Sequence, residues 1–134
     1  MRYERLEHTA DAMVRCFGST LEECFENAAY ALSDQMLDAS TVDEKMEFNV
    51  DVTGSDLEER LFAYLSEILF IIDSETVALS RFTVSFDGDR VYGKAYGEPL
   101  DLAKHRPKTE IKAVTYHMMR IDPSVPELTV VFDA

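Results

Sequence analysis

The chain has 134 residues, which suits one ordinary domain that buries about two-thirds of the surface its unfolded form exposes. Apolar residues make up 46% of it, no apolar run approaches the roughly 20 residues of a membrane span, and two cysteines are too few for a disulfide framework. With 26 acidic and 13 basic side chains the formal charge is −13, which disfavours direct high-affinity binding of nucleic acid and favours cations or basic proteins as partners.

The N-terminal segment has no continuous apolar core of the kind found in secretion signals. We therefore expect a cytoplasmic protein that does not enter a membrane.

In chain order, the first half alternates short strands with helices. Ser19 and Thr20 each precede a glutamate by three residues, as does Ser55, and this spacing predicts capping boxes at the start of two helices. Apolar residues then recur at helical spacing through each helix, which predicts one buried face. The expected elements are strands at 3–6, 13–17 and 46–52 and helices at 19–36 and 55–72.

The second half is dominated by strands. Residues 77–86 and 90–96 form a predicted hairpin, because the Asp-Gly pair between them suits a tight turn. The long segment 97–109 contains two prolines and is predicted to be a functional or disordered loop. A last strand is expected at 128–132.

The stretch 110–121 alternates like a strand, with apolar residues on both faces. Such a pattern predicts an interior strand covered on both sides. His117 would then point into the core and would need a hydrogen-bond partner there.

Together these elements predict an α+β fold. Residues 1–134 are expected to form a single domain in which two helices pack on one face of a largely antiparallel sheet.

Few residues suggest chemistry. Cys16 and Cys24 are expected to be small buried hydrophobes. Two places remain for carboxylate chemistry: Asp11 close to His8, and Asp133 beside the terminal carboxylate of Ala134. These oxygens would converge on a calcium or magnesium ion if the first and last strands were neighbours. Alternatively, Asp11 caps a loop and Asp133 is a solvated tail residue.

Several motifs in this chain resemble the archease family. They extend over nearly its whole length: HTADA at 8–12, GSTLEECFENAAYAL at 18–32, YGEPLDLAKH at 96–105, TEIKAVTYHMM at 109–119 and the final VVFDA.

The resemblance implies an accessory protein that activates an RtcB-type RNA ligase in tRNA splicing and RNA repair, promoting its guanylylation and multiple turnover. It implies a divalent metal site, with calcium the expected ion, at Asp11, Asp133 and Ala134, with His8 and Asp38 as further neighbours. The chain departs from the family in ending on Ala134 rather than on a larger aliphatic residue.

The family-like segments also suggest residues that contact the ligase or its nucleotide, namely Lys104, His105 and Lys112; Lys112 could equally be an exposed charge at the end of a strand. Two other functions stay open. One is a metal-dependent hydrolase that uses Asp11 and Asp133, and the other is a chaperone-like interaction module without chemistry.

Overall fold

The computed structural model describes residues 1–6 and 11–134. Its helices are α1 (Leu21–Met36), α2 (Leu57–Glu75) and the short α3 (Leu102–His105), with a 3-10 turn, η1 (Ala39–Thr41). Its strands are β1 (Tyr3–Leu6), β2 (Ala12–Phe17), β3 (Met46–Thr53), β4 (Val77–Asp87), β5 (Arg90–Pro99), β6 (Ala113–Asp122) and β7 (Glu127–Asp133).

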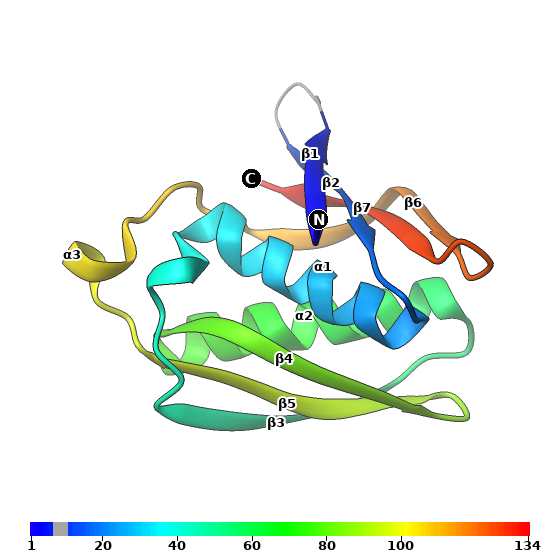
Figure 1. Ribbon diagram of the computed structural model, residues 1–134, viewed down its shortest axis with the longest axis horizontal. Helices are drawn as coiled ribbons and strands as arrows, with labels where there is room; N and C mark the ends of the chain where they lie inside the picture. Colours follow the sequence, from blue (N-terminus) through cyan, green and yellow to red (C-terminus); the bar gives the residue numbers. More distant parts are fainter. Residues whose placement is uncertain (7–10) are drawn as a thin grey trace.

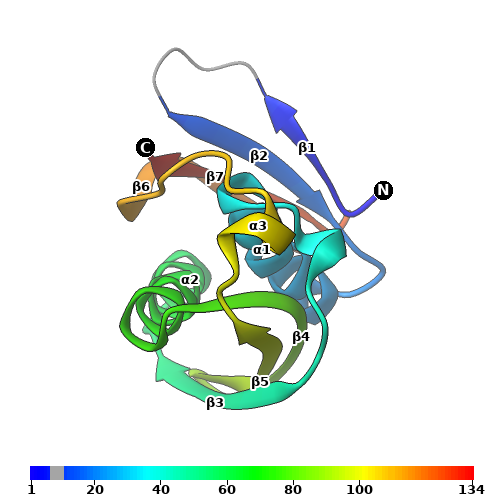
Figure 2. The same cartoon turned by 90° about the vertical axis from the view of Figure 1, so that its left-hand side faces the viewer.

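The strands form two antiparallel sheets with a layer of helices between them (Figure 1). One sheet has the order β1-β2-β7-β6 and the other the order β3-β5-β4. Seen end-on in Figure 2, α1 and α2 lie side by side between the sheets, α1 packing on β4 and β2, and α2 on β3 and β6. The predicted α+β single domain is confirmed, but its strands divide into two sheets, so the helices are covered from both sides.

Both long helices begin at a side-chain cap. The Thr20 hydroxyl accepts a hydrogen bond from the backbone N–H of Glu23, as predicted for one of the two possible registers. In α2 the cap is Asp56 rather than Ser55, because the Asp56 carboxylate accepts from the backbone N–H of Glu59. The Ser55 hydroxyl instead donates to the Glu59 side chain.

The core lies in the helical layer and draws on both sheets. Phe25 of α1 is fully buried, with its ring edge-on to Phe86 of β4 at 5.0 Å and tilted against Tyr64 of α2 at 6.0 Å. Val14 of β2 and Phe132 of β7 reach the same cluster from the other sheet. Burying each large apolar side chain contributes about 1.5–3 kcal/mol, so the two sheets stabilise one another through a shared core.

The position predicted for the strand at 110–121 was wrong. β6 is the edge strand of its sheet and pairs only with β7. Between the pairs Thr115–Val131 and Arg120–Thr129, β6 advances five residues while β7 advances two, so β6 bulges out of the ladder. His117 lies in this bulge and is exposed rather than buried.

Within the described residues, no helix combines the length and apolar character needed to cross a membrane.

Candidate functional site

Asp11 and Asp133 lie at the same end of the two central strands of the four-stranded sheet, β2 and β7. We call this end the edge, and under the proposed function the metal edge. β2 and β7 pair antiparallel with Ala12 opposite Phe132. Asp11 directly precedes the first of these residues and Asp133 directly follows the second, so the two acids occupy neighbouring positions. The C-terminus lies beside the start of β2 in both Figures 1 and 2. The last strand therefore lies beside β2 and not beside the first strand, β1, as the shared site was expected to require, yet this pairing still brings Asp11 and Asp133 to neighbouring positions.

Hydrogen bonds from Arg5 and Lys112 hold this edge in place. Arg5 donates from Nη2 to the carbonyl oxygen of Asp11 at 3.1 Å and from Nη1 to Gln35 of α1 at 2.9 Å. The backbone N–H of Lys112 donates to the carbonyl oxygen of Asp133 at 2.7 Å. Lys112, a predicted partner-binding residue, is thus brought next to Asp133, and its side chain is exposed.

The oxygens at this edge suit a hard cation. Asp133 is exposed, and Ala134 is half-buried against the core. Carboxylate and backbone oxygens are the ligands that calcium and magnesium prefer. Across residues 1–6 and 11–134, however, no three His, Cys, Asp or Glu side chains cluster as metal ligands would.

His8 and Asp38 were expected as further neighbours of the metal. His8 lies outside the described residues. Asp38 caps η1, where its carboxylate accepts from the backbone N–H of Ser40 at 3.1 Å and from the Ser40 hydroxyl at 2.6 Å. These hydrogen bonds, with the nearby charges of Lys108 and Arg106, lower the pKa of Asp38. The Asp38 carboxylate is thus engaged in a local turn.

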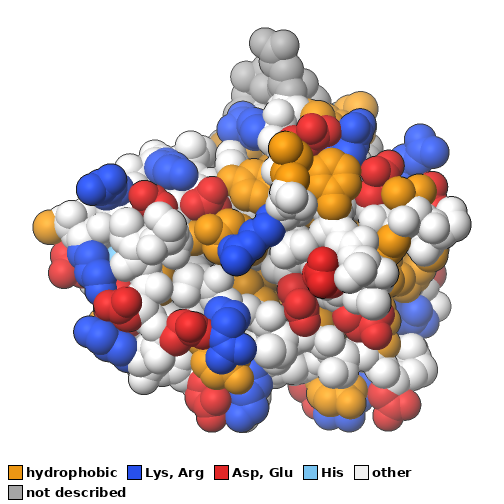
Figure 3. Space-filling model, viewed as in Figure 1, with side chains coloured by type: hydrophobic (Ala, Val, Ile, Leu, Met, Phe, Trp, Pro, Cys, Tyr) orange, Lys and Arg blue, Asp and Glu red, His pale blue; other side chains and the backbone are white. Residues whose placement is uncertain are grey.

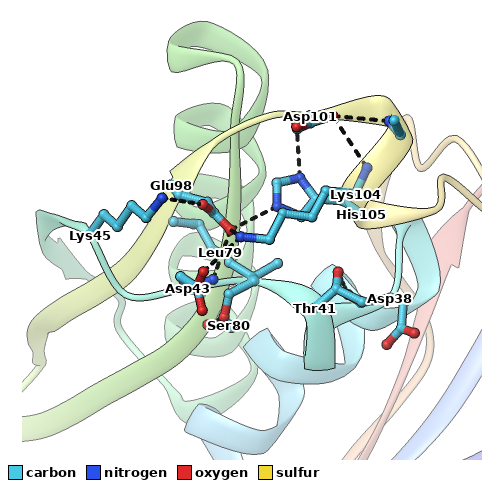
Figure 4. Close-up of polar contacts among 12 residues, drawn as sticks. Asp38, Thr41, Asp43, Lys45, Leu79, Ser80, Glu98, Asp101, Lys104 and His105 are labelled. Carbon is cyan, nitrogen blue, oxygen red and sulfur yellow. Dashed lines mark hydrogen bonds and ion pairs between the residues drawn. The ribbon is translucent and has the colours of Figure 1, made fainter.

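A second polar cluster surrounds Glu98, near the end of β5, and draws in side chains of the following α3 segment (Figure 4). The Glu98 carboxylate is nearly buried and accepts three hydrogen bonds at Oε2: from the backbone N–H of Asp43 at 2.8 Å, from Lys104 Nζ at 2.7 Å and from His105 Nε2 at 2.9 Å. Lys45 Nζ lies 3.4 Å from Oε1. The Asp43 hydrogen bond, followed by those of Lys104 and His105, holds the pKa of Glu98 far below its usual range.

His105 is buried inside the protein rather than exposed on its surface. Its side chain is fully buried, and its Nδ1 accepts a hydrogen bond from the backbone N–H of Asp101 at 3.0 Å. Because Nδ1 is an acceptor, the imidazole is the neutral tautomer with its hydrogen on Nε2, which donates to Glu98. The partner-binding role predicted for His105 thus stays a prediction that this burial does not favour.

Lys104, the neighbouring predicted contact residue, has partners within the chain. Its ammonium group lies 2.7 Å from both Asp43 and Glu98, and these two carboxylates raise its pKa. The side chain is 35% exposed, so these partners do not enclose it completely.

Sequence reasoning missed Glu98 and Asp43, which organise this cluster. The available signal was the concentration of Lys104, His105 and Arg106 just after Glu98, since a carboxylate near several cations often gathers them. Sequence could not indicate that Asp43, 55 residues earlier, supplies a backbone donor.

The two cysteines fit their predicted role. Both are buried and free of disulfides. Burial raises the pKa of both thiols, that of Cys24 to about 11, so neither is a reactive thiolate at neutral pH.

Two antiparallel sheets around a pair of helices, with Asp11 and Asp133 at the shared end of the neighbouring strands β2 and β7, define a class of small α+β proteins. The chain belongs to the Archease protein family (MTH1598/TM1083), whose family model matches residues 3–134. The resemblance seen in its motifs is thereby confirmed.

Known relatives are similar to this chain in sequence and fold over most of its length. The protein archease of Pyrococcus furiosus is 43% identical over 125 residues, which cover 90% of this chain and 88% of that protein. The solution structure of protein 1598 from Methanobacterium thermoautotrophicum superposes with a TM-score of 0.86 at 35% identity and covers 99% of both chains. The crystal structure of a Thermotoga maritima archease, named a possible chaperone, has a TM-score of 0.65 at 24% identity and covers 98% of this chain and 96% of its own, and it bears on the fold alone.

Proposed function

We propose that this protein is a metal-binding accessory protein that activates an RtcB-type RNA ligase in tRNA splicing and RNA repair. It promotes guanylylation of the ligase and its return to further rounds of joining, and it is not itself a ligase. The observation that supports this most is the archease family match over residues 3–134, in a fold that places Asp11 beside Asp133.

The metal part of the proposal rests on the oxygens at that edge. Asp11, Asp133 and the backbone oxygens of Ala134 would hold a divalent ion, which we propose to be calcium. Calcium takes six to eight oxygen ligands, more than these residues supply, so water and groups from the partner would complete its coordination. The bound ion would supply a positive charge on an otherwise acidic protein, where it could face a phosphate or carboxylate of the partner.

The charge of the whole chain supports a basic protein partner. The net charge of −13 repels phosphate backbones, whereas a ligase that binds RNA presents a basic surface. The face shown in Figure 3 has Lys and Arg side chains interspersed with Asp and Glu rather than a continuous basic area. Electrostatic attraction would thus speed association with the ligase without competition for its RNA.

Lys112 and Lys104 are the proposed contact residues. Lys112 is adjacent to Asp133 and exposed, so it would meet whatever partner approaches the metal edge. Lys104 is held by Asp43 and Glu98 and would present its remaining exposed side.

The test is a guanylylation assay with the cognate ligase, GTP and a divalent ion. The intact protein is expected to increase both ligase guanylylation and multiple-turnover joining, and Asp11→Ala and Asp133→Ala are expected to abolish that increase. Asp89→Ala, which removes an exposed acid from the β4–β5 turn, is the matched control and should stimulate normally.

Other outcomes would contradict the proposal in separate parts. No stimulation by the intact protein would refute the activator role. Equal stimulation by the two aspartate variants would refute the metal site alone. Turnover of RNA or nucleotide by the protein without ligase would favour the hydrolase, and suppressed aggregation of unrelated basic proteins would favour the chaperone-like module.

Metal binding also has a readout without the ligase. Calcium should raise the thermal unfolding midpoint of the wild type and of Asp89→Ala, since an ion that binds only the folded state stabilises it. Asp133→Ala should lose this response, as measured by calorimetry with and without calcium.

A further inference from the structure

The outer side of α2 is a second surface with features of a binding site. In Figure 2, α2 lies at the left-hand edge of the helical layer, with β6 above it and β3 below, and neither sheet covers this side. We call this surface, from Phe62 to Asp73 of α2 with the adjoining bulge of β6, the α2 flank.

Exposed apolar side chains concentrate on and beside the α2 flank. Among the described residues, five of the eight large hydrophobic side chains with high exposure lie here: Phe70, Leu100, Leu102, Tyr116 and Met118. Phe70 is 63% exposed, which is a high value for an aromatic residue in the middle of a long helix. Contiguous exposed apolar surface of this kind marks protein interaction sites.

The bulge of β6 contributes directly to this surface. It places the Tyr116 ring flat against that of Phe62, with centroids 4.3 Å apart and planes inclined by 6°. Met118 adopts a positive φ of 54° within the bulge, a conformation rare for a non-glycine residue, and its side chain is 55% exposed. The irregular edge strand therefore holds Tyr116 against α2 and leaves the Met118 side chain exposed in the same bulge.

Two hollows flank Asp73. One, of about 270 Å³, is lined by Phe62, Phe70 and the start of β6. The other, of about 400 Å³, lies under the 100–110 segment and is lined largely by apolar side chains, including Leu100 and Leu102. Asp73 lines both, so the hollows adjoin along one side of the helix.

The charged groups around the α2 flank are mostly acidic. Asp73 is exposed, and within residues 1–6 and 11–134 its side chain has no hydrogen bond or ion pair. Burial, and after it the negative charges of Glu59 and Asp56, raise the pKa of Tyr116. Two cations lie at the hollows: Lys108, at the larger one, is already engaged by Asp34, and Lys112, which lines the smaller one, is exposed. Glu110 lines the larger hollow and adds a further acid. A partner that fits this surface would therefore place a cation against Asp73.

The dimensions suit a short segment of a protein. Fourteen residues separate Phe62 from Thr76, which lines the far hollow, and at about 1.5 Å per residue the flank is on the order of 20 Å long. Nucleic acid is disfavoured because its phosphates would face carboxylates. A second copy of this chain is disfavoured because two flanks would oppose Asp73 and Glu59 with like charges.

We propose that the α2 flank is a docking surface for a basic, apolar segment of the RNA ligase; this assignment rests on the proposed function. The flank adjoins the metal edge at Lys112 but does not include Asp11 or Asp133. Apolar side chains of the ligase fill the two hollows, and a Lys or Arg between them pairs with Asp73. The flank then supplies affinity, while the edge at Asp11 and Asp133 supplies activation.

The test measures the dissociation constant of the cognate ligase by titration calorimetry, and guanylylation in parallel. Phe70→Ser removes the exposed aromatic ring, and Asp73→Lys reverses the central charge. Each is expected to weaken binding by about tenfold or more, as for centrally placed interface residues. Asp133→Ala is expected to lose stimulation, with a smaller loss of affinity than either flank variant.

Matched controls exclude general effects. Val125→Ser replaces an apolar side chain of similar exposure, 59%, in the turn between β6 and β7, and Asp89→Lys makes the same charge change in the β4–β5 turn. Both should bind within about twofold of wild type. Neither flank variant should unfold the protein, since Phe70 is exposed and a cation in the last turn of a helix is favourable; circular dichroism checks this.

The outcomes separate the two proposals. If the wild type binds and stimulates the ligase, and both flank variants match their controls, the docking proposal is overturned while the proposed function stands. If the wild type neither binds nor stimulates, the proposed function fails and the assignment of the ligase to the flank fails with it.

Discussion

Glu98 shows how one carboxylate can hold three segments together. Its Oε2 atom accepts from Asp43 before β3, and from Lys104 and His105 of α3, while Glu98 itself lies near the end of β5. A nearly buried charge is tolerated only when it is paired and hydrogen-bonded, and these donors meet that requirement. The position of Lys104 in the proposed ligase contact therefore depends on Glu98.

Replacement of Glu98 by glutamine should destabilise the protein in a pH-dependent way. The folded-state pKa of Glu98 lies well below the ordinary value of about 4.3, so its contribution to stability is full above that pH and is lost as the pH falls toward the folded-state pKa. The thermal unfolding midpoint of Glu98→Gln should lie several degrees below that of the wild type at pH 7, and this difference should narrow below about pH 4. Thermal melts of both proteins at several pH values measure the difference. A difference independent of pH would contradict the prediction.

At this scale the sequence predicted candidate residues but not their surroundings. Asp11 and Asp133 were identified, yet their adjacency depends on pairing between strands separated by more than 100 residues, which no local pattern encodes. His105 was expected to contact the ligase because it lies in a segment that resembles the family. Its burial depends on Glu98 and on the Asp101 backbone, which only the folded loop brings to it.

At the scale of elements, apolar periodicity predicted the positions of the helices correctly, whereas alternation did not predict the position of a strand within its sheet. Both long helices occur close to their predicted positions because apolar spacing and caps act within a few residues. The alternation at 110–121 predicted a strand correctly, but it could not distinguish an interior strand from an edge strand whose outer apolar residues remain exposed. Tyr116 and Met118 are such residues.

The start of α2 allows a direct test of the cap. Asp56→Ala should lower the free energy of unfolding by about 1 kcal/mol, because it removes the acceptor for the Glu59 backbone N–H. Ser55→Ala, at the position favoured by the sequence pattern, should change it by less than about 0.5 kcal/mol. Urea denaturation of the two variants compares them, and the reverse order would place the cap at Ser55.

At the scale of the whole molecule, the two sheets depend on one helical layer. The sequence predicted one sheet because hairpin-length connections do not reveal where a sheet divides. The division follows from the helices. Each helix packs on strands of both sheets, so each has apolar side chains buried against one sheet on one side and against the other sheet on the opposite side. The wide apolar stripe of α2 was the local sign of this arrangement.

Phe25 tests the cooperativity of that arrangement. Phe25→Ala should lower the free energy of unfolding by about 3–5 kcal/mol, because it leaves a cavity between α1, α2 and β4. Tyrosine fluorescence and far-ultraviolet circular dichroism should report coincident urea transitions in wild type and variant. Separate transitions would mean that the two sheets unfold independently.

The place of β7 has a consequence for how the protein is made. β7 is synthesised after every other strand described here, yet it lies between β2 and β6 and joins them into one sheet. The sheet of β3, β4 and β5 is contiguous in sequence and can assemble while translation continues. The edge that contains Asp11 and Asp133 forms only after residue 133 has left the ribosome, so nascent chains lack the proposed activating site until synthesis reaches that point.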